Sequence, residues 1–491
     1  MKTAVYKKIR GTTAVLLVLL CMFFAWPMSA KAAVYQDGLY QPETEPQAAS
    51  AILVNENSGA VVYAKNADEQ QQMASLVKMV TALVVMDNVK DLDAETVTAE
   101  GWVFDALYGL NASTADIRKG ETLTVRELLY ALLLPSANEA ALMLAGYVSG
   151  GYTENFIYLM EQKVASLGCT STVFGDPNGI SENNLTTARD MALIVREFMK
   201  NPTLVEVAAT STYKMAAHNH AADYNIFSTN RLLLKTDPYS LKFKSVIGTV
   251  IAGKTGSLGE WQNFASQAVK DDILYTCVVL NSPNAADVVA QENKYQYSRP
   301  ALYESAQLYD WAFTTLTIQP VIEEGKAVTE VKVKFSSDKD SVLLEAPEAL
   351  TAVLPKDGSA VVEKQFDVPD AVDAPVKEGQ VIGSVTFLVD GKEIGTAPLA
   401  ATQSVSRNYI LFIIYHIKNF ASTAAFKWIL LLLILAVTVY GLLVYRARKK
   451  YKKRQAAPKN SATASRPTQP PNAPLQNTRG EPSPRPPQKR R

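Results

Sequence analysis

The sequence predicts an α+β protein in which an antiparallel sheet packs against helices, followed by a small all-β domain and one transmembrane helix. Strand-like patterns both precede and follow a long helical stretch, which is typical of one sheet built from the two ends of a helical segment. After Ile318 the helical patterns stop and strand-like runs continue to about residue 405. Residues 428–445 are then free of charge, as a membrane-spanning helix requires.

Periodicity and turn residues predict the elements of the first domain, residues 33–317. Residues 47–63 predict a β-hairpin, because two apolar runs flank a turn-forming stretch. Helical spacing of apolar residues follows to about Lys200, and strand-like runs return around residues 246–279. Helices are expected at Ser75–Val89, Val125–Leu134, Glu139–Val148, Thr187–Lys200 and Pro300–Thr315.

Residues 318–405 predict a second domain, a small β-sandwich. Their apolar runs alternate or are short, and turn residues separate them, as in antiparallel strands. The clearest strand-like runs are Val328–Phe335, Ala360–Phe366, Val381–Val389 and Glu393–Leu399.

The net charge of +1 hides an uneven distribution. Residues 1–32 contain five basic and no acidic residues, whereas residues 446–491 contain fourteen basic residues and one acid, so residues 33–445 carry −17. This partition excludes a uniformly neutral cytosolic enzyme and indicates that the ends and the middle face different surroundings.

Residues 1–32 predict a secretory signal peptide. Basic residues precede an uncharged run, and the small-residue pattern Ala30-Lys31-Ala32 follows it, which favours cleavage after Ala32. A retained membrane helix is the alternative, but the apolar run is short for that role. Cys169 and Cys277 remain in the exported part, and the sequence leaves open whether they form a disulfide or are buried thiols.

Residues 428–445 predict a single transmembrane helix. Eighteen helical residues span about 27 Å, close to the hydrocarbon thickness of a bilayer. Basic residues follow at once, so residues 446–491 are expected in the cytoplasm and the acidic middle of the chain outside the cell membrane. Residues 406–427 form a juxtamembrane segment, with an apolar stretch that suits the membrane surface.

The tail at residues 446–491 is basic and rich in Pro, which predicts a disordered segment held near anionic lipid. Nucleic acid is not expected as a partner, because no aromatic residue is interleaved with the basic residues after Tyr451.

Three short motifs carry candidate chemistry. Ser75 and Lys78 are three positions apart in an expected helix, so the amine lies on the face of the hydroxyl and can take its proton. Ser136-Ala137-Asn138 lies on a turn between two expected helices, and Lys254-Thr255-Gly256 lies among strand-like residues. Each motif alone is weak, since Ser-x-x-Lys and Ser-x-Asn both recur elsewhere in the chain.

Together and in this order, the three motifs resemble those of β-lactamases and penicillin-binding proteins. With the neighbouring stretches Asp176–Ile180 and Thr187–Ala192, the chain most resembles the D-alanyl-D-alanine carboxypeptidases among the low-molecular-weight penicillin-binding proteins. The resemblance covers about residues 47–315 and implies a β-lactamase/transpeptidase-like domain. The β-rich segment after it suits the second domain of this family.

The resemblance implies a serine peptidase that removes the terminal D-alanine from peptidoglycan stem pentapeptides during cell-wall maturation. Ser75 would form an acyl-enzyme that water hydrolyses. Lys78 would be the base and must be neutral, so burial or a second cation such as Lys254 should lower its pKa. Ser136 would pass a proton to the leaving amine. β-Lactam antibiotics would acylate Ser75 and inhibit the enzyme.

The same resemblance implies the substrate-binding residues. Asn138 would bind the substrate amide, and Lys254 with Thr255 would hold the terminal carboxylate. Gly256 would let the substrate backbone lie against the strand. The backbone N–H groups of Ser75 and Ser257 would form the oxyanion hole.

Two other functional classes have weaker support. Residues 248–255 match the P-loop pattern, but a P-loop must open into a helix N-terminus, and Val250-Ile251 favours a strand. His218-Asn219-His220 contains the only neighbouring histidines, too few for a catalytic zinc, and no metal or cofactor is expected.

The chain also departs from the family pattern. Ile251-Ala252-Gly253 lacks the acidic residue that often precedes Lys-Thr-Gly, and Leu185-Thr186 replaces a Tyr-Ser or similar pair. Residues 182–186 partly resemble the general-base motif of class A β-lactamases, with Thr186 in place of asparagine. A β-lactamase and a non-catalytic cell-wall-binding member of the family are therefore the alternatives.

Overall fold

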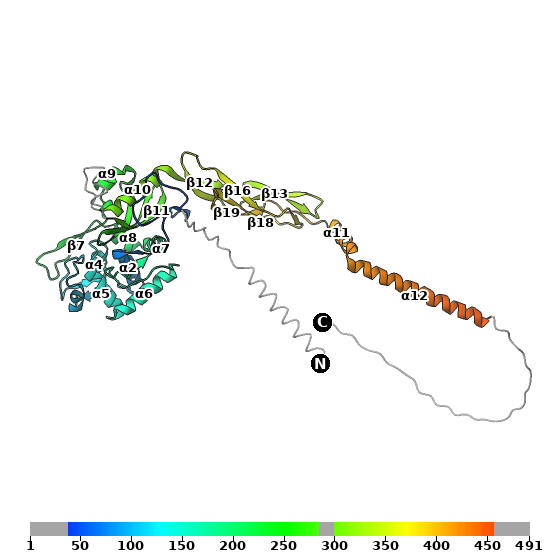
Figure 1. The fold of residues 1–491 in the computed structure, drawn as a ribbon, viewed down its shortest axis with the longest axis horizontal. Coiled ribbons are helices and arrows are strands. Elements are labelled where there is room, and N and C mark those ends of the chain that lie inside the picture. Colours follow the sequence, from blue (N-terminus) through cyan, green and yellow to red (C-terminus); the bar gives the residue numbers. More distant parts are fainter. Residues whose placement is uncertain (1–37, 284–298, 456–491) are drawn as a thin grey trace, which may run out of the picture. The chain divides into compact units, whose positions relative to one another are not determined.

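The computed structural model describes residues 38–283 and 299–455 (Figure 1). The chain forms two compact units, of which the first ends at Asn408 and the second begins at Tyr409. Each unit is described by itself. The predicted signal peptide, residues 1–32, and residues 456–491 of the predicted tail lie outside the described residues.

A five-stranded antiparallel sheet organises the first domain. Its order is β2-β1-β11-β10-β9, so the N-terminal hairpin pairs with strands from far along the chain, with Ser50 opposite Leu280. In the described part of the chain, β9 is an edge of this sheet. The strands are β1 (Ser50–Asn55), β2 (Val61–Lys65), β9 (Val250–Leu258), β10 (Trp261–Lys270) and β11 (Ile273–Pro283).

Side chains alternate across this sheet and build two cores. In β1, Ile52 and Val54 face a core shared with most of the helices, whereas Ala51 and Leu53 face a second core with α10 (Pro300–Thr315). The helices of the first core are α2 (Val77–Asn88), α3 (Gly101–Leu107), α4 (Val125–Leu133), α5 (Asn138–Ser149), α6 (Thr153–Ser166), α7 (Ala188–Met199) and α8 (Pro202–Ala209). The predicted hairpin, the five predicted helices and the layered α+β fold are confirmed.

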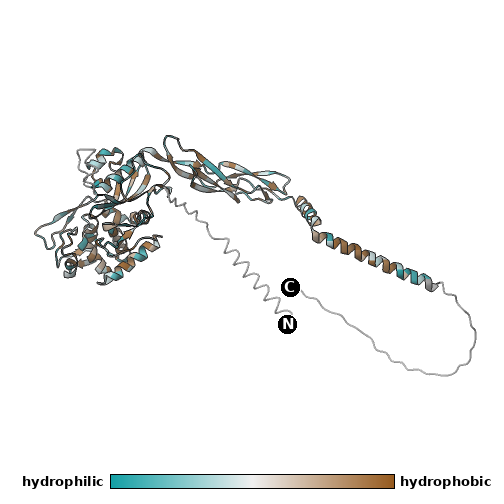
Figure 2. Cartoon of the chain, in the orientation of Figure 1, coloured by the Kyte–Doolittle hydropathy of each residue, from teal (hydrophilic) through white to brown (hydrophobic). Residues whose placement is uncertain are grey.

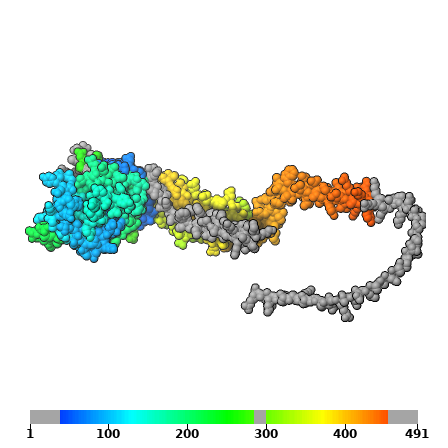
Figure 3. Space-filling view, turned by 90° about the horizontal axis from the view of Figure 1, so that it is seen from below, coloured from blue at the N-terminus to red at the C-terminus, as the bar shows by residue number. Residues whose placement is uncertain are grey.

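Small elements complete this domain, which Figure 3 shows from below as one packed body coloured blue to green. Three two-stranded pairs border the helices: β3 (Gln71–Gln72) with β6 (Leu185–Thr186), β4 (Thr96–Thr98) with β5 (Thr122–Thr124), and β7 (Thr212–Met215) with β8 (Tyr224–Phe227). Among the short helices, η1 (Ala74–Leu76) and η2 (Arg231–Leu233) contact β9, whereas α9 (Pro238–Lys242) and η3 (Lys244–Val246) contact α10.

The second domain is all-β, as predicted. A six-stranded sheet of order β16-β18-β19-β14-β13-β17 shares a core with the pair β12–β15. The four runs expected from the sequence are β13 (Ala327–Lys334), β16 (Val362–Asp367), β18 (Val381–Val389) and β19 (Lys392–Ala401). The sequence analysis did not single out β12 (Leu316–Ile322), β14 (Ser341–Glu345), β15 (Leu350–Pro355) or β17 (Ala371–Asp373).

The structure settles the pairing of the two cysteines and the P-loop match, which the sequence left open. Cys169 and Cys277 are free and buried, so they are not paired with each other. The P-loop match runs into β9, which continues to Leu258 as a strand. Without a helix after the lysine, this stretch lacks the N-terminal amides that would bind phosphates, and the P-loop alternative is wrong.

In the described residues 409–455, the second unit has two helices, α11 (Tyr409–Ser422) and α12 (Ala424–Gln455). Residues 424–452 are long and apolar enough to cross a membrane, and Figure 2 colours most of α12 as hydrophobic before it turns hydrophilic. The helix also includes Arg446–Gln455, which the sequence analysis assigned to the disordered tail. Lys and Arg are good helix formers and the next proline is Pro458, so the helix can continue.

Candidate active site

The three motifs meet where the helical layer borders edge strand β9. Nζ of Lys78 lies 3.0 Å from Oδ1 of Asn138, and Nζ of Lys254 lies 2.9 Å from Oγ of Ser136. A Cβ on Gly256 would lie 3.0 Å from the carbonyl oxygen of Met73, two residues before Ser75. The fold therefore brings together residues that are up to 181 positions apart in the chain.

Ser75 lies on a strained turn at the start of the helical segment. It occupies η1, before α2 begins at Val77, and Ala74 has a left-handed φ of +47°. The N-cap residues are Met73 for η1 and Leu76 for α2, and neither helix has a side-chain capping hydrogen bond. The Ser75 hydroxyl therefore does not cap a helix. The side chain is half-buried and is available for chemistry.

Lys78 is fully buried and has three polar neighbours. Its Nζ lies 3.0 Å from Oγ of Ser75, and it also donates to Oδ1 of Asn138 and to the carbonyl oxygen of Asn178. The last two atoms can only accept hydrogen bonds. A neutral amine has two N–H donors for these acceptors, and its lone pair is then left for the Ser75 hydroxyl. This arrangement suits removal of the Ser75 proton.

The surroundings of Lys78 make its neutral form available at neutral pH. Burial lowers the pKa of Lys78 from 10.5 to about 7, while the carboxylates of Asp176 and Glu139 act in the opposite direction. Desolvation is the larger effect, so the pKa falls although two carboxylates favour the charged amine.

The turn after Pro177 supplies the carbonyl that holds Lys78. The Asp176 carboxylate accepts hydrogen bonds from four backbone N–H groups, of Asn178, Gly179, Ile180 and Ser181. Nδ2 of Asn184 donates to the same carboxylate at 2.9 Å. Asp176 is therefore occupied in fixing the turn.

Gly179 in this turn packs directly on the Ser75 backbone. It has a φ of +88°, and a Cβ there would lie 2.3 Å from the carbonyl oxygen of Ala74 and 2.8 Å from the amide nitrogen of Ser75. Only glycine fits such an approach, and the contact holds the nucleophile's turn in place.

Ser136 and Asn138 lie on the turn that leads into α5. Ser136 has a left-handed φ of +69° and is 5% exposed. Asn138 begins α5, and its Nδ2 donates to the carbonyl oxygen of Ser113 at 2.9 Å, which assigns its Oδ1 to Lys78. The side chain of Ser136 faces Lys254, whereas that of Asn138 faces Lys78.

Lys254 is the second buried amine of the site. It is 1% exposed and donates to Ser136 Oγ and to the carbonyl oxygen of Thr255, 2.8 Å away. Burial, followed by the neighbouring Lys78, holds its pKa well below the usual value. Neither of these hydrogen-bond partners is a carboxylate. An anionic group of a ligand could therefore bind to the Lys254 amine without displacing an acidic side chain.

Gly256 and Ser257 belong to the open side of β9. Every second N–H and C=O of an edge strand points away from its neighbour, so β9 can pair with an extended peptide. Gly256 lies opposite Asn263 in β10, and its missing side chain leaves room beside Met73. The Ser257 side chain is exposed.

The sequence analysis missed several residues of this site. Thr229 accepts a hydrogen bond from Thr255 Oγ1 at 2.6 Å, and Arg299 donates to the carbonyl oxygen of Thr229. The half-buried Arg299 thus lies next to the Thr255 end of the site and adds a cation there. Asn178 and Ser113 act through backbone carbonyls, which have no sequence signature.

One departure from the family pattern has a structural reason. Ile251 stands where an acidic residue is common, and its side chain packs against the large core beside the helices. The position is therefore used for packing in this chain.

Comparison with known proteins gives a consistent match. The sequence pattern of the D-alanyl-D-alanine carboxypeptidase family matches residues 37–284, and that of the C-terminal domain of penicillin-binding protein 5 matches residues 317–407. D-alanyl-D-alanine carboxypeptidase DacF of Bacillus subtilis is 27% identical over 384 residues, which cover 77% of this chain and 91% of DacF.

Two further comparisons extend this match. DacC of Escherichia coli, also a D-alanyl-D-alanine carboxypeptidase, is 29% identical over 363 residues, which cover 72% of this chain and 83% of DacC. The crystal structure of penicillin-binding protein 5 from Haemophilus influenzae superposes with a TM-score of 0.55 at 25% identity and covers 75% of this chain and all of that one.

Proposed function

Because the chain belongs to the D-alanyl-D-alanine carboxypeptidase family of serine penicillin-binding proteins, we propose that its Ser75 cleaves the terminal D-alanine from peptidoglycan stem pentapeptides. The single observation that carries this assignment is the position of Lys78. Its amine is buried, is oriented by two carbonyl oxygens and lies 3.0 Å from Ser75 Oγ. A hydroxyl beside a neutral amine is an activated nucleophile.

In the first step, Ser75 Oγ attacks the carbonyl carbon between the two D-alanines while Lys78 takes the hydroxyl proton. The backbone N–H groups of Ser75 and Ser257 stabilise the resulting oxyanion. The bond to the leaving D-alanine then breaks, and Ser136 passes a proton to the departing amine. Water hydrolyses the ester on Ser75 in a second step and regenerates the enzyme.

The substrate is proposed to add to β9 as a further strand. Its backbone pairs with the open edge beside Gly256, and Asn138 Nδ2 or Oδ1 contacts its amide. The terminal carboxylate binds at Lys254 and Thr255, with Thr229 and Arg299 close by. A negatively charged carboxylate bound beside Lys254 raises the pKa of this lysine toward its ordinary value and so strengthens the ion pair.

β-Lactams are expected to inhibit the enzyme by acylating Ser75, because their strained amide takes the place of the scissile bond. A long-lived adduct needs slow hydrolysis. Glu182 belongs to the stretch that resembles the general-base motif of a β-lactamase, but its side chain is exposed. It is also not one of the two carboxylates that act on Lys78, which are Asp176 and Glu139.

The direct test compares native protein with Ser75→Ala. Native protein should release D-alanine from a peptide ending in D-Ala-D-Ala and bind a labelled penicillin covalently at Ser75. Ser75→Ala should lose both activities, with a drop in turnover on the order of 10⁴-fold or more. Absence of D-alanine release by the native protein would overturn the carboxypeptidase assignment, and rapid release of opened penicillin would favour a β-lactamase. Stable penicillin labelling without D-alanine release would favour the non-catalytic alternative.

The enzyme is proposed to act at the outer face of the cell membrane, where it contributes to cell-wall biogenesis and cell shape. A signal peptide at residues 1–32 would export the chain, α12 would span the membrane once, and the basic residues after Tyr445 would stay in the cytoplasm. Labelled penicillin that does not enter cells should therefore label the protein in intact protoplasts. A chain that ends at Asn408 should keep the label and leave the membrane fraction.

A further inference from the structure

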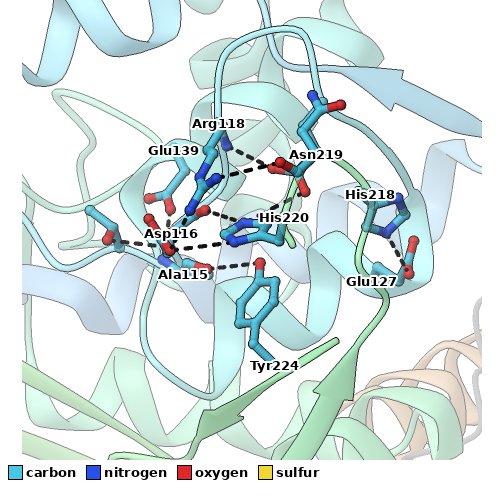
Figure 4. Close-up of polar contacts among 11 residues, drawn as sticks. Ala115, Asp116, Arg118, Glu127, Glu139, His218, Asn219, His220 and Tyr224 are labelled. Carbon is cyan, nitrogen blue, oxygen red and sulfur yellow. Dashed lines mark hydrogen bonds and ion pairs between the residues drawn. The ribbon is translucent and has the colours of Figure 1, made fainter. Parts of the chain in front are cut away.

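The tip of the β7–β8 hairpin packs on the loop that contains Ala115, Asp116 and Arg118 (Figure 4). Residues 216–223 form this tip, and the loop comprises residues 111–121. Neither segment contains a residue to which the proposed mechanism assigns a role.

The loop fixes the orientation of the Asn138 side chain. The carbonyl oxygen of Ser113 accepts hydrogen bonds from both the backbone N–H and Nδ2 of Asn138, each 2.9 Å long. The backbone N–H of Ala115 donates to Oε1 of Glu139 at 2.6 Å. Since Asn138 presents its Oδ1 to Lys78, a displaced Ser113 carbonyl would free the amide to rotate and would disturb Lys78.

The hairpin holds the other side of the same loop. His220 Nε2 lies 2.8 Å from the carbonyl oxygen of Asp116, and Tyr224 Oη donates to the carbonyl oxygen of Ala115 at 3.1 Å. The two rings lie 4.2 Å apart, and the side chain of His220 is only 7% exposed. A carbonyl oxygen can only accept, so Nε2 of His220 carries a hydrogen.

Charged groups surround this histidine, but the geometry does not form a metal site. The Asp116 carboxylate lies 3.7 Å from Nδ1, and the buried Glu121 carboxylate lies 3.8 Å from Nε2. Arg118 reaches over the loop to the carbonyl oxygen of Asn219. Among residues 38–283 and 299–455, no group of three His, Cys, Asp or Glu side chains could hold a metal ion.

We propose that His220 is a positioning residue for catalysis: its Nε2–H holds the 113–116 segment, so that Ser113 fixes Asn138 and Asn138 orients Lys78. The proposal rests on the proposed function, because it needs Ser75 and Lys78 to be the reacting pair. Its effect reaches the reacting atoms through the backbone of residues 113–116 and then through the hydrogen bonds of Asn138. A displacement of about 1 Å at a reacting group costs on the order of 10²-fold in rate.

His218 provides a matched control in the same hairpin tip. Its Nε2 lies 3.0 Å from Oε1 of Glu127, the residue that completes the capping box of α4. This contact connects the tip to α4 and does not involve the loop at residues 111–121. A substitution at His218 therefore disturbs the hairpin but leaves the Asp116 hydrogen bond in place.

The test measures the rate constant for acylation by labelled penicillin, the KM and kcat for a D-Ala-D-Ala peptide, and thermal stability in the full-length protein. His220→Phe keeps a ring against Tyr224 but removes the donor, and it should acylate about 10- to 100-fold more slowly. His220→Gln restores an N–H donor and should return to within about 3-fold of the native rate. His218→Phe should acylate at the native rate.

Each outcome is decisive. Native-rate acylation by folded His220→Phe would overturn the positioning role, as would equal slowing by His220→Phe and His218→Phe. If His220→Phe fails to fold, His220→Gln and His220→Asn decide: Gln should acylate faster than Asn because the shorter side chain falls short of Asp116, and equal rates would overturn the proposal. Failure of the native protein to be acylated would instead refute the proposed function itself.

Discussion

Nζ of Lys254 donates a hydrogen bond of 2.9 Å to Oγ of Ser136, although the two residues are 118 positions apart. The contact joins the turn before α5 to edge strand β9. Because Lys254 donates, the hydrogen of Ser136 Oγ is free to point toward the substrate. A leaving amine that arrives there meets a hydroxyl donor supported by a buried amine, as the proposed proton relay requires.

The acylation rate should depend on pH through Lys78. Its pKa is lowered from 10.5 to about 7, and the base works only when it is neutral. The rate constant for acylation by penicillin should therefore fall about tenfold per pH unit below 7 and level off above it. Stopped-flow or quenched labelling between pH 5 and pH 9 measures this profile. A midpoint near 10 would contradict the role of burial.

Substitution of Asp176 by asparagine should shift the midpoint of that pH profile and lower the folding stability. Loss of the carboxylate removes the charge that most opposes deprotonation of Lys78, so the midpoint should move below pH 7. An amide also offers only one acceptor oxygen to four backbone N–H groups, which should cost roughly 2–4 kcal/mol of folding stability. A pH profile and a denaturant titration measure the two effects. An unchanged midpoint would exclude this electrostatic coupling.

Substitution of Lys254 by glutamine should impair recognition of the substrate carboxylate. Turnover of a peptide ending in D-Ala-D-Ala should fall about 100-fold or more, since a charge-assisted contact in a buried site is lost. The variant should also lose the native preference for that peptide over its C-terminal amide. Lys235→Gln, at an exposed lysine, is the control and should behave as native. If Lys254→Gln still prefers the peptide over its C-terminal amide, residues other than Lys254 bind the substrate carboxylate.

Substitution of Gly179 by alanine should damage both stability and acylation. Its left-handed φ alone costs roughly 1–2 kcal/mol for alanine, and the clash with Ala74 and Ser75 adds a similar amount. Gly150→Ala is the matched control, because Gly150 has a φ of +69° but nothing within 4 Å of an added Cβ. Thermal unfolding and penicillin labelling should separate the two variants. Equal losses of stability and an unchanged labelling rate in Gly179→Ala would rule out the close contact.

Patterns of local residues predicted most of the fold. The helix at Pro300–Thr315 has the bounds expected from the sequence, because a proline starts it and its apolar spacing is regular. Strands β14 and β15 were missed, since they are only five and six residues long and their apolar residues stand next to each other, which gives little period-two signal. Their pairing partners in the second domain decide that they are strands.

The sequence alone also identified the candidate residues: Ser75 with Lys78, Ser136 with Asn138, and Lys254–Gly256 as motifs, and Ser257 through the resemblance that these motifs support. The tertiary structure decided what surrounds them. The carbonyl oxygens of Asn178 and Ser113 hold Lys78 and Asn138, and burial rather than residue type lowers the pKa of Lys78. A backbone carbonyl is present at every position, so the sequence could not single out these two. Burial was one of two causes expected for the pKa of Lys78, and the packing of distant segments decided for it.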